Sequence, residues 1–383
     1  MSMVPGPPLG LLAELTHRCP LRCPYCSNPV DLARRGTEMS TADWAEVFRQ
    51  AGALGVLHLH LSGGEPAARA DLPALVAHAV AAGLYTNLIT SGLLLDATRL
   101  AQLAARGLDH VQLSFQDSDP ARADHVAGYP GAHGRKLALA RQVRDAGLPL
   151  TINAVVHRQN LARLDALIDL AVALGARRLE IAHVQYHGWA LTNRDALLPT
   201  RAQVDQATET VRRRADMLRG VLAIDYVTPD YHASRPKPCM GGWGRQVIVV
   251  SPAGKALPCH GAESLPSLSF ADVRHHDLRW IWEQSDAFRR FRGTAWMRSP
   301  CRGCPNATAD WGGCRCQAFA LLGDAAAADP VCALSPGHAH IHDAVARASG
   351  ATAAFTGRGP RRSGVGNADG DPAANEARDQ TPG

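Results

Sequence analysis

Three cysteines lie close together near the start of the chain, at positions 19, 23 and 26 of the segment ELTHRCPLRCPYCSNP. Cysteine thiolates in so short a loop are typical metal ligands. Structural zinc sites are closed by four ligands, so a set of three leaves one coordination position open. The spacing predicts a four-iron cluster in which thiolates cap three irons and the fourth iron has no protein ligand. An open iron indicates a reactive centre.

A structural zinc site or a piece of a two-cluster ferredoxin is the alternative interpretation of this loop. A ferredoxin run uses two-residue gaps throughout and takes a further cysteine nearby. Neither feature occurs here, because the first gap has three residues. The open four-iron site is therefore the favoured prediction.

The segment LSGGEP, at 61–66, is the second candidate element. Gly63 and Gly64 would let the backbone approach a ligand closely, and Glu65 would place negative charge beside a cationic ammonium group. Alone, this segment could equally be a plain turn. Its position one strand after the cysteine loop makes a shared site the better interpretation.

The other seven cysteines all lie between positions 239 and 332. Two four-ligand sites need eight ligands, so either one cluster has an open iron or an oxygen or nitrogen ligand completes it. Asp310 lies between the pair Cys301/Cys304 and the pair Cys314/Cys316, where it could serve. These spacings can also bind zinc, which remains an alternative.

The elements that must position these residues alternate between strand-like and helix-like segments. Six strand–helix units predict a parallel sheet with right-handed crossovers, curved as a partial (β/α)6 barrel. In that architecture both candidate loops follow strands and meet at the same mouth. The six strands are expected at 9–15, 56–62, 84–90, 109–116, 148–156 and 176–184.

The chain divides into three parts by composition. We expect the barrel core at 1–225, a small cysteine-rich domain at 226–345, and a disordered tail without chemistry at 346–383. The middle part is poor in long apolar periodic segments, so metal ligation should stabilise it. The tail is polar and rich in Gly and Ala.

Composition excludes several classes of function. The net charge is +5, but there is no basic run and only 5% of residues are aromatic, so no nucleic-acid groove is expected. No secretory signal or membrane span is visible, which predicts a cytoplasmic protein without a membrane partner. In that reducing compartment the ten cysteines are expected to be metal ligands or redox-active groups rather than disulfides.

The CxxxCxxC spacing, with Tyr25 just before the third cysteine, resembles the radical S-adenosylmethionine (SAM) superfamily. The resemblance implies that Cys19, Cys23 and Cys26 hold a [4Fe-4S] cluster whose open iron is chelated by the amino and carboxylate groups of SAM. An electron from the cluster would cleave SAM to methionine and a 5′-deoxyadenosyl radical. Tyr25, Gly63, Gly64 and Glu65 are the expected cofactor contacts.

The stretch from about 9 to 340 resembles more narrowly the PqqA peptide cyclase family, radical SAM enzymes with a C-terminal SPASM domain. The segments LTHRCPLRCPYCSNP, QLSFQD, VQYHGWALTNR and PCRGCPNATADWGGCRCQAF carry this resemblance. It implies two auxiliary iron–sulfur clusters of two-iron or four-iron type. One would be held by Cys239, Cys259, Cys314 and Cys316. The other would be held by Cys301, Cys304, Asp310 and Cys332. The aspartate would raise that cluster's potential and make it more labile.

By this resemblance the protein is an oxidoreductase that joins a Glu side-chain carbon to a Tyr ring carbon in the PqqA precursor peptide, an early step of pyrroloquinoline quinone biosynthesis. The auxiliary clusters would take the electron released when the ring regains aromaticity. The implied partners are the peptide chaperone PqqD and a flavodoxin-type electron donor. The alternatives are another SPASM peptide maturase, for example a thioether-forming one, and an electron-transfer or zinc scaffold without turnover.

Other polar residues near the expected mouth are weaker candidates. Ser114 and Asn153, near the ends of the fourth and fifth strands, are either ribose ligands or ordinary turn residues. His58 and His60 alternate along the second strand and are predicted as core histidines. The segment after the sixth strand either lines a peptide channel or packs as a loop; it contains Tyr186, His187 and Trp189.

Overall fold

The computed structural model describes residues 6–30, 32, 35–351 and 354–358. Its strands form one sheet in the order β7-β6-β5-β4-β3-β2-β1-β8-β9. The strands are β1 (Gly10–Glu14), β2 (His58–Ser62), β3 (Tyr85–Thr90), β4 (His110–Phe115), β5 (Leu150–Val156), β6 (Arg178–His183), β7 (Ala223–Val227), β8 (Val247–Val250) and β9 (Ala256–Leu257).

The predicted partial barrel is confirmed, and the sheet continues beyond it at both ends. Neighbouring strands from β7 to β8 pair in parallel, and β9 is antiparallel to β8. The cysteine-rich part contributes β8, which pairs with β1 from Gly10↔Val247 to Ala13↔Val250. The boundary expected at 225/226 falls within β7. The two parts therefore share one ladder, which the sequence pattern did not indicate.

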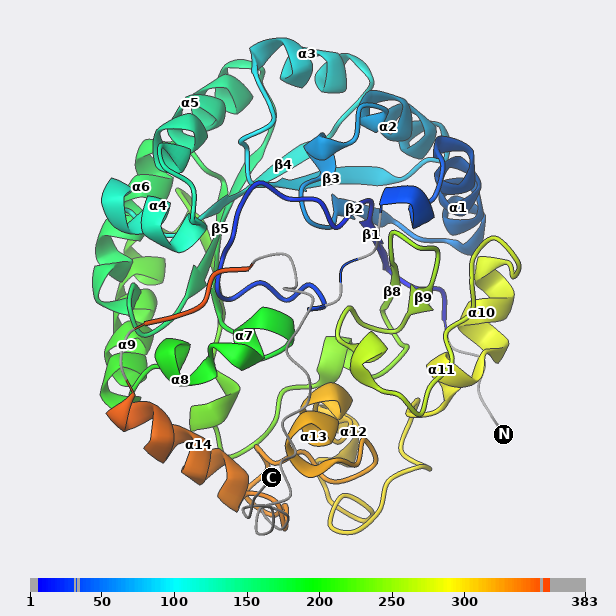
Figure 1. The fold of residues 1–383 in the computed structure, drawn as a ribbon, viewed down its shortest axis with the longest axis vertical. Coiled ribbons are helices and arrows are strands. Elements are labelled where there is room, and N and C mark those ends of the chain that lie inside the picture. The colour runs from blue at the N-terminus through cyan, green and yellow to red at the C-terminus, as the bar shows by residue number, and fades with distance from the viewer. Residues whose placement is uncertain (1–5, 31, 33–34, 352–353, 359–383) are drawn as a thin grey trace, which may run out of the picture.

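The larger helices form an outer ring around the sheet (Figure 1). The helices of the first half of the chain are α1 (Thr41–Leu54), α2 (Leu72–Ala81), α3 (Ala97–Ala105), α4 (Pro120–Ala127), α5 (Ala132–Asp145), α6 (Leu164–Ala173), α7 (Gly188–Thr192), α8 (Arg194–Leu197) and α9 (Arg201–Met217). They lie in the connections between β1 and β7, where the longer ones return the chain for the next parallel strand. The helices of the second half are α10 (Leu278–Gln284), α11 (Asp286–Arg289), α12 (Ala307–Asp310), α13 (Arg315–Leu322) and α14 (Ala339–Gly350).

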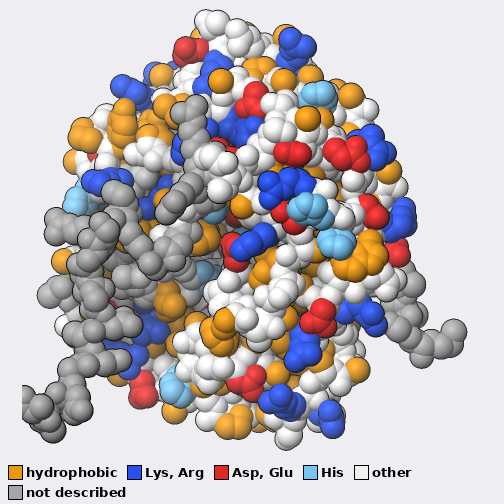
Figure 2. Space-filling view, turned by 45° about the vertical axis from the view of Figure 1, so that its right-hand side comes forward, with side chains coloured by type: hydrophobic (Ala, Val, Ile, Leu, Met, Phe, Trp, Pro, Cys, Tyr) orange, Lys and Arg blue, Asp and Glu red, His pale blue; other side chains and the backbone are white. Residues whose placement is uncertain are grey.

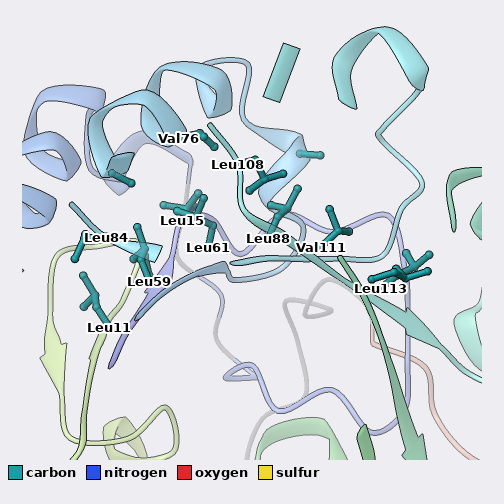
Figure 3. Packing of buried hydrophobic residues seen from close by; sticks show 14 of the residues in the cluster. Leu11, Leu15, Leu59, Leu61, Val76, Leu84, Leu88, Leu108, Val111 and Leu113 are labelled. Carbon is teal, nitrogen blue, oxygen red and sulfur yellow. The ribbon is translucent and has the colours of Figure 1, made fainter. Parts of the chain in front are cut away.

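The main core lies between the sheet and this ring of helices. Alternate strand residues such as Leu59 and Leu61 are fully buried there, beside Leu88 and Val111 of the next two strands (Figure 3). Each fully buried leucine of this kind contributes about 2 kcal/mol relative to an exposed one. Packing on this face fixes the strand register, so the other face of every strand must point into the barrel.

The inner face of the barrel is polar. The Asn87 amide donates to Gln112 Oε1 at 3.1 Å, and the amides of Gln112 and Asn153 both donate to one oxygen of Glu180 at 2.9 Å. His60 joins this network, with its Nδ1 3.1 Å from the Asn87 amide nitrogen. The prediction of core histidines on β2 is wrong for His58, which is exposed, because the alternation that buries Leu59 and Leu61 places the histidines on the opposite face. His60 is partly buried inside the barrel and hydrogen-bonded there.

Buried arginine holds the cysteine-rich part together where apolar residues are few. Arg315 is 1% exposed and donates to the carbonyls of Ala325 at 2.9 Å and Ala327 at 2.7 Å. It also donates to the carbonyl of Gly312. These bonds satisfy loop carbonyls that would otherwise be buried without partners.

Part of the segment 346–383, which is predicted to be disordered, has a defined structure. Helix α14 runs to Gly350 because Ile341, Ala344 and Ala348 recur at helical spacing and lie in one apolar cluster with Val184 and Leu197. Residues 354–358 then lie against the barrel mouth, as described below. The remainder of the expected disordered tail lies outside the described residues.

The surface carries both signs of charge. On the face shown in Figure 2, basic and acidic side chains are interspersed over the described residues. Within the part of the chain that the structure describes, every helix is too short or too polar to cross a bilayer.

Candidate active site

The cysteine loop leaves β1 and crosses the mouth of the barrel, where Figure 1 shows it in dark blue. Neighbouring segments hold its backbone: Leu15 N–H donates to Ser62 O at 2.9 Å and Arg22 N–H donates to Ala127 O at 2.7 Å. Leu21 packs with Ala127 in a small apolar cluster that Cys19 and Cys23 border. The loop is thus held by the ends of β2 and α4.

The three thiols of this loop lie partly buried and interact electrostatically. Burial raises the pKa of Cys19 to about 12 and that of Cys23 to about 11. The charge of Cys23 adds to the shift at Cys19, and the charge of Cys26 adds to the shift at Cys23. Bare thiolates are therefore unfavourable at Cys19 and Cys23.

The segment LSGGEP lies directly against the cysteine loop. Gly64 N–H donates to Thr16 O at 2.5 Å, and Glu65 N–H donates to Arg18 O at 2.7 Å. A Cβ on Gly63 would lie 2.4 Å from Thr16 O, and Gly63 has φ +125°. The glycines therefore allow a close approach between two backbone segments. Their predicted contact with a ligand stays a prediction.

We predict that Gly64→Ala disrupts the cysteine loop. A Cβ at this position would lie 2.5 Å from Arg18 O, so the loop must shift, at a cost of about 1–3 kcal/mol. The unfolding temperature and the iron content per chain would both fall. Gly134→Ala is the matched control, because its Cβ meets nothing within 4 Å. Equal iron content in the two variants would contradict the prediction.

Glu65 is fully buried and accepts four hydrogen bonds from the protein. Its Oε1 accepts from Ala67 N–H at 3.0 Å and the Thr90 hydroxyl at 2.7 Å. Its Oε2 accepts from Ser91 N–H at 2.7 Å and from the Ser91 hydroxyl. The carboxylate thus ties the loop after β2 to the end of β3. The predicted contact between Glu65 and an ammonium group remains a prediction.

Tyr25 and a buried lysine form a chain of contacts leading to Cys23. Burial raises the pKa of Tyr25 well above its usual range, and its hydroxyl hydrogen-bonds Cys23 and Gln116. Lys136 Nζ donates to Gln116 Oε1 at 2.6 Å and to Ser114 O at 2.8 Å. Burial lowers the pKa of Lys136 to about 8, against the opposing charges of Cys23 and Glu65.

Sequence reasoning missed Lys136, although a signal existed. It lies on the same face of α5 as the buried residues Leu139, Ala140 and Val143. A lysine on an apolar helix face is uncommon unless its charge has a partner. Its position beside the cysteine loop supplies that partner.

Four of the C-terminal cysteines form one buried group. Cys239 contacts Cys259 and Cys314, and Cys316 contacts the same two thiols. The Sγ atoms of Cys259 and Cys316 are 3.7 Å apart. These hydrogen bonds lower the pKa of Cys259 and Cys314 well below the usual thiol range. Segments far apart in sequence therefore deliver four sulfur ligands to one place.

The other four predicted ligands line a second small cavity. They are Cys301, Cys304, Asp310 and Cys332. Burial raises the pKa of Cys301, and the negative charges of the other three residues oppose its ionisation to differing degrees. The donor set has three thiols and one carboxylate, which suits iron–sulfur ligation with one hard ligand.

Asp329, which sequence reasoning did not single out, lines the same cavity. It is 1% exposed, and burial raises its pKa to about 7. It accepts from Cys314 N–H at 2.6 Å, Gln317 Nε2 at 2.9 Å and Val331 N–H at 2.9 Å. Among the described residues, the Asp310 carboxylate accepts from Gly312 N–H alone, at 2.8 Å. Asp310 is therefore the freer of the two carboxylates.

The spacing of the sulfur quartet suits a tetrahedral metal as well as a cluster. The 3.7 Å between Cys259 Sγ and Cys316 Sγ equals the edge of a tetrahedron with zinc–sulfur bonds of about 2.3 Å. A cluster would hold each thiolate on a different iron. The donor types fit iron–sulfur clusters at all three places.

The segment after β6 lies beside the sulfur quartet. Burial disfavours the charged form of His187, but its hydrogen bond to Cys314 raises its pKa. Tyr186 is buried, with its ring 4.9 Å from that of Tyr231. Tyr186 and His187 line a cavity with Asp230 and Cys239. Of the weaker candidates, Asn153 belongs to the polar network inside the barrel.

The chain matches two family models in the regions described above. The Radical SAM superfamily model matches residues 13–171, which contain the cysteine loop and the LSGGEP segment. The SPASM model, described as an iron–sulfur cluster-binding domain, matches residues 239–305. The two matches correspond to the barrel and to the cysteine-rich part.

Curated relatives are similar over nearly the whole chain. The PqqA peptide cyclase of Methylocella silvestris is 59% identical over 342 residues, covering 89% of this chain and 92% of that one. The chain belongs to the PqqA peptide cyclase family. A second family member, from Bradyrhizobium diazoefficiens, is 58% identical over 337 residues, covering 88% of this chain and 89% of that one.

Solved structures outside the PqqA peptide cyclase family share the fold. Streptococcus suis SuiB bound to S-adenosylmethionine has a TM-score of 0.71 at 20% identity, covering 85% of this chain and 77% of that chain. The SuiB complex with its precursor peptide SuiA has a TM-score of 0.69 at 20% identity, covering 85% and 76%. At this identity the likeness establishes the arrangement of elements.

Proposed function

We propose that the protein is a PqqA peptide cyclase that joins a Glu side-chain carbon to a Tyr ring carbon within the PqqA precursor peptide. The observation that carries the proposal is the gathering of all ten cysteines into three groups, in a chain 59% identical to a curated family member. Three lie in the loop at the barrel mouth, four in the buried quartet, and three beside Asp310 in the second cavity.

In this proposal Cys19, Cys23 and Cys26 hold a [4Fe-4S] cluster and leave one iron open for SAM. When bound, the cluster and SAM would supply the one-electron chemistry that removes a hydrogen atom from the Glu γ-carbon of the peptide. The chain's own residues fix the loop before binding: Glu65 braces it through β3, and Tyr25 donates to Cys23. The barrel around the loop keeps water away from reactive intermediates.

The proposed auxiliary sites account for the remaining oxidation. Crosslinking removes two hydrogens from the peptide: one goes to the deoxyadenosyl group, and the other leaves the Tyr ring as a proton and an electron. Cys239, Cys259, Cys314 and Cys316 would hold one electron-accepting cluster. Cys301, Cys304, Asp310 and Cys332 would hold the other. The proposed division of the chain is a barrel core at 1–225 and an auxiliary domain at 226–345.

The test is mass spectrometry of the PqqA precursor peptide after anaerobic reaction with reconstituted protein, SAM and a reductant. A loss of two hydrogens, located to a Glu–Tyr pair by fragmentation, is expected. Precursors with Glu replaced by Gln or Tyr replaced by Phe serve as controls. Modification only of cysteine-bearing peptides would instead identify a thioether-forming maturase, and zinc content without 5′-deoxyadenosine would identify a scaffold.

The proposed partners follow from the family. PqqD would present the precursor peptide, and a flavodoxin-type protein would donate the electron. The proposed location is the cytoplasm, where thiols are kept reduced and available for cluster assembly. Turnover should rise when PqqD is added to a limiting amount of precursor, and this rise should be absent for a short peptide that contains only the Glu–Tyr segment.

We predict that Asp310 and Asp329 respond differently to substitution. Asp310→Cys should keep the cluster in the second cavity and lower its reduction potential, because a thiolate donates more electron density than a carboxylate. Asp310→Ala should lose iron from that cavity. Asp329→Asn is the control, since it keeps the side-chain shape and one carbonyl acceptor. Greater iron loss in Asp329→Asn than in Asp310→Ala would reverse the assignment.

A further inference from the structure

Residues 354–358, here named the C-terminal strap, dock in the mouth of the barrel. Thr356 N–H donates to Asn193 Oδ1 at 2.7 Å, and the Asn193 amide donates back to Thr356 O at 2.8 Å. The Phe355 ring lies 5.2 Å from the ring of His125. Figure 1 shows this segment, in orange-red, running from α14 towards the dark-blue cysteine loop. The strap is therefore held by specific contacts on both sides of the mouth.

The strap ends with an arginine buried against the cysteine loop. Arg358 is 7% exposed, its backbone N–H donates to Arg22 O at 3.0 Å, and its guanidinium donates to His17 O at 2.6 Å. Another guanidinium nitrogen lies 3.7 Å from Cys26 Sγ. Arg358 thus contacts the loop before, within and after its first two cysteines.

The buried charge of Arg358 needs an anionic partner, and no carboxylate of the described residues supplies one. No Asp or Glu among the described residues lies within ion-pair distance of its guanidinium. Burial of a charged guanidinium is costly without an anionic partner. The partner that the geometry offers is the Cys26 thiolate, and a cluster held by Cys19, Cys23 and Cys26 would be a net negative site.

We propose that Arg358, delivered by the C-terminal strap, is a positioning residue for the iron–sulfur cluster of Cys19, Cys23 and Cys26, and that its charge stabilises the reduced cluster. The inference rests on the proposed function of this loop. Reduction adds one electron, from an external one-electron donor, to a site that is already anionic. A fixed cation beside Cys26 lowers the energy of that added charge and so raises the midpoint potential.

The experiment is a potentiometric titration of the full-length reconstituted protein with dithionite, followed by electron paramagnetic resonance. The signal of the N-terminal cluster is identified as the one lost in the Cys19→Ala/Cys23→Ala/Cys26→Ala variant. Arg358→Gln should shift the midpoint potential of this signal to lower values. Arg358→Lys, which keeps the charge, should have a midpoint potential close to that of the unsubstituted protein. Arg347→Gln, on the exposed side of α14, is the matched control and should behave as the unsubstituted protein.

The auxiliary clusters serve as an internal reference in the same samples. A shift confined to the N-terminal signal supports the proposal. An unchanged N-terminal potential in folded Arg358→Gln, or equal shifts of all signals, overturns it and leaves a purely structural strap. Absence of any signal that depends on Cys19, Cys23 and Cys26 would instead overturn the proposed function of the loop, and the inference with it.

Discussion

Cys23→Ala should abolish production of 5′-deoxyadenosine, with a fall of at least about a thousandfold, as expected when an essential group of a catalytic unit is lost. Cys23 lies at the centre of the loop, where it interacts with Cys19 and accepts the hydrogen bond of Tyr25. The two remaining thiolates cannot hold a four-iron cluster that has a single open iron. The measurement is chromatography of the anaerobic reaction with SAM and dithionite, together with iron and sulfide analysis.

Ser27→Ala is the matched control for this variant, because Ser27 is exposed in the same loop. It should keep full deoxyadenosine production. Iron in Cys23→Ala should fall by one cluster, since the quartet and the second cavity use other residues. Normal SAM cleavage in folded Cys23→Ala would remove the basis for the proposed function.

Cys259→Ala should give the opposite pattern, with SAM cleavage retained and crosslinking lost. Cys259 is 6% exposed and contacts both Cys239 and Cys316 within the quartet. Without this ligand the proposed electron acceptor cannot form, while the cysteine loop is a separate group in the barrel. Crosslinked peptide should fall about a hundredfold or more, and deoxyadenosine should stay within about threefold of normal, a separation typical of groups that act in different steps.

The same reaction mixture yields both quantities, so their ratio is independent of enzyme concentration. Ser267→Ala, an exposed substitution in the neighbouring loop, is the control. Equal loss of both products would mean that the quartet supports the fold of the barrel mouth and has no separate role in the reaction.

The barrel could be predicted from sequence because its signals are local. Strands such as 58–62 and helices such as 41–54 follow clear hydrophobic periods and end at glycines or caps, and Gly55 is a left-handed C-cap for α1. The two candidate loops could then be placed at one mouth by topology alone. The short helices α4, α7 and α8 were missed, since each has too few residues to show a period.

Contacts that depend on distant residues could not be predicted in this way. The acceptors of the Arg358 hydrogen bonds lie more than 330 residues earlier, at His17 and Cys26. Composition alone made its segment look disordered. The bonds that Glu65 accepts from Thr90 and Ser91 could not be predicted, because these residues lie at the end of another strand. Asp329 lacked a motif and is recognised only through the cavity it lines.

The pairing of β8 with β1 has a consequence for the catalytic cycle. The ladder joins Leu11 to Ile248 and Ala13 to Val250, and all four side chains are fully buried. A hinge between the halves would have to break these bonds and expose that surface. The distance between the cysteine loop and the sulfur quartet is therefore set on folding, and ligand binding would not change it by a hinge motion between the halves.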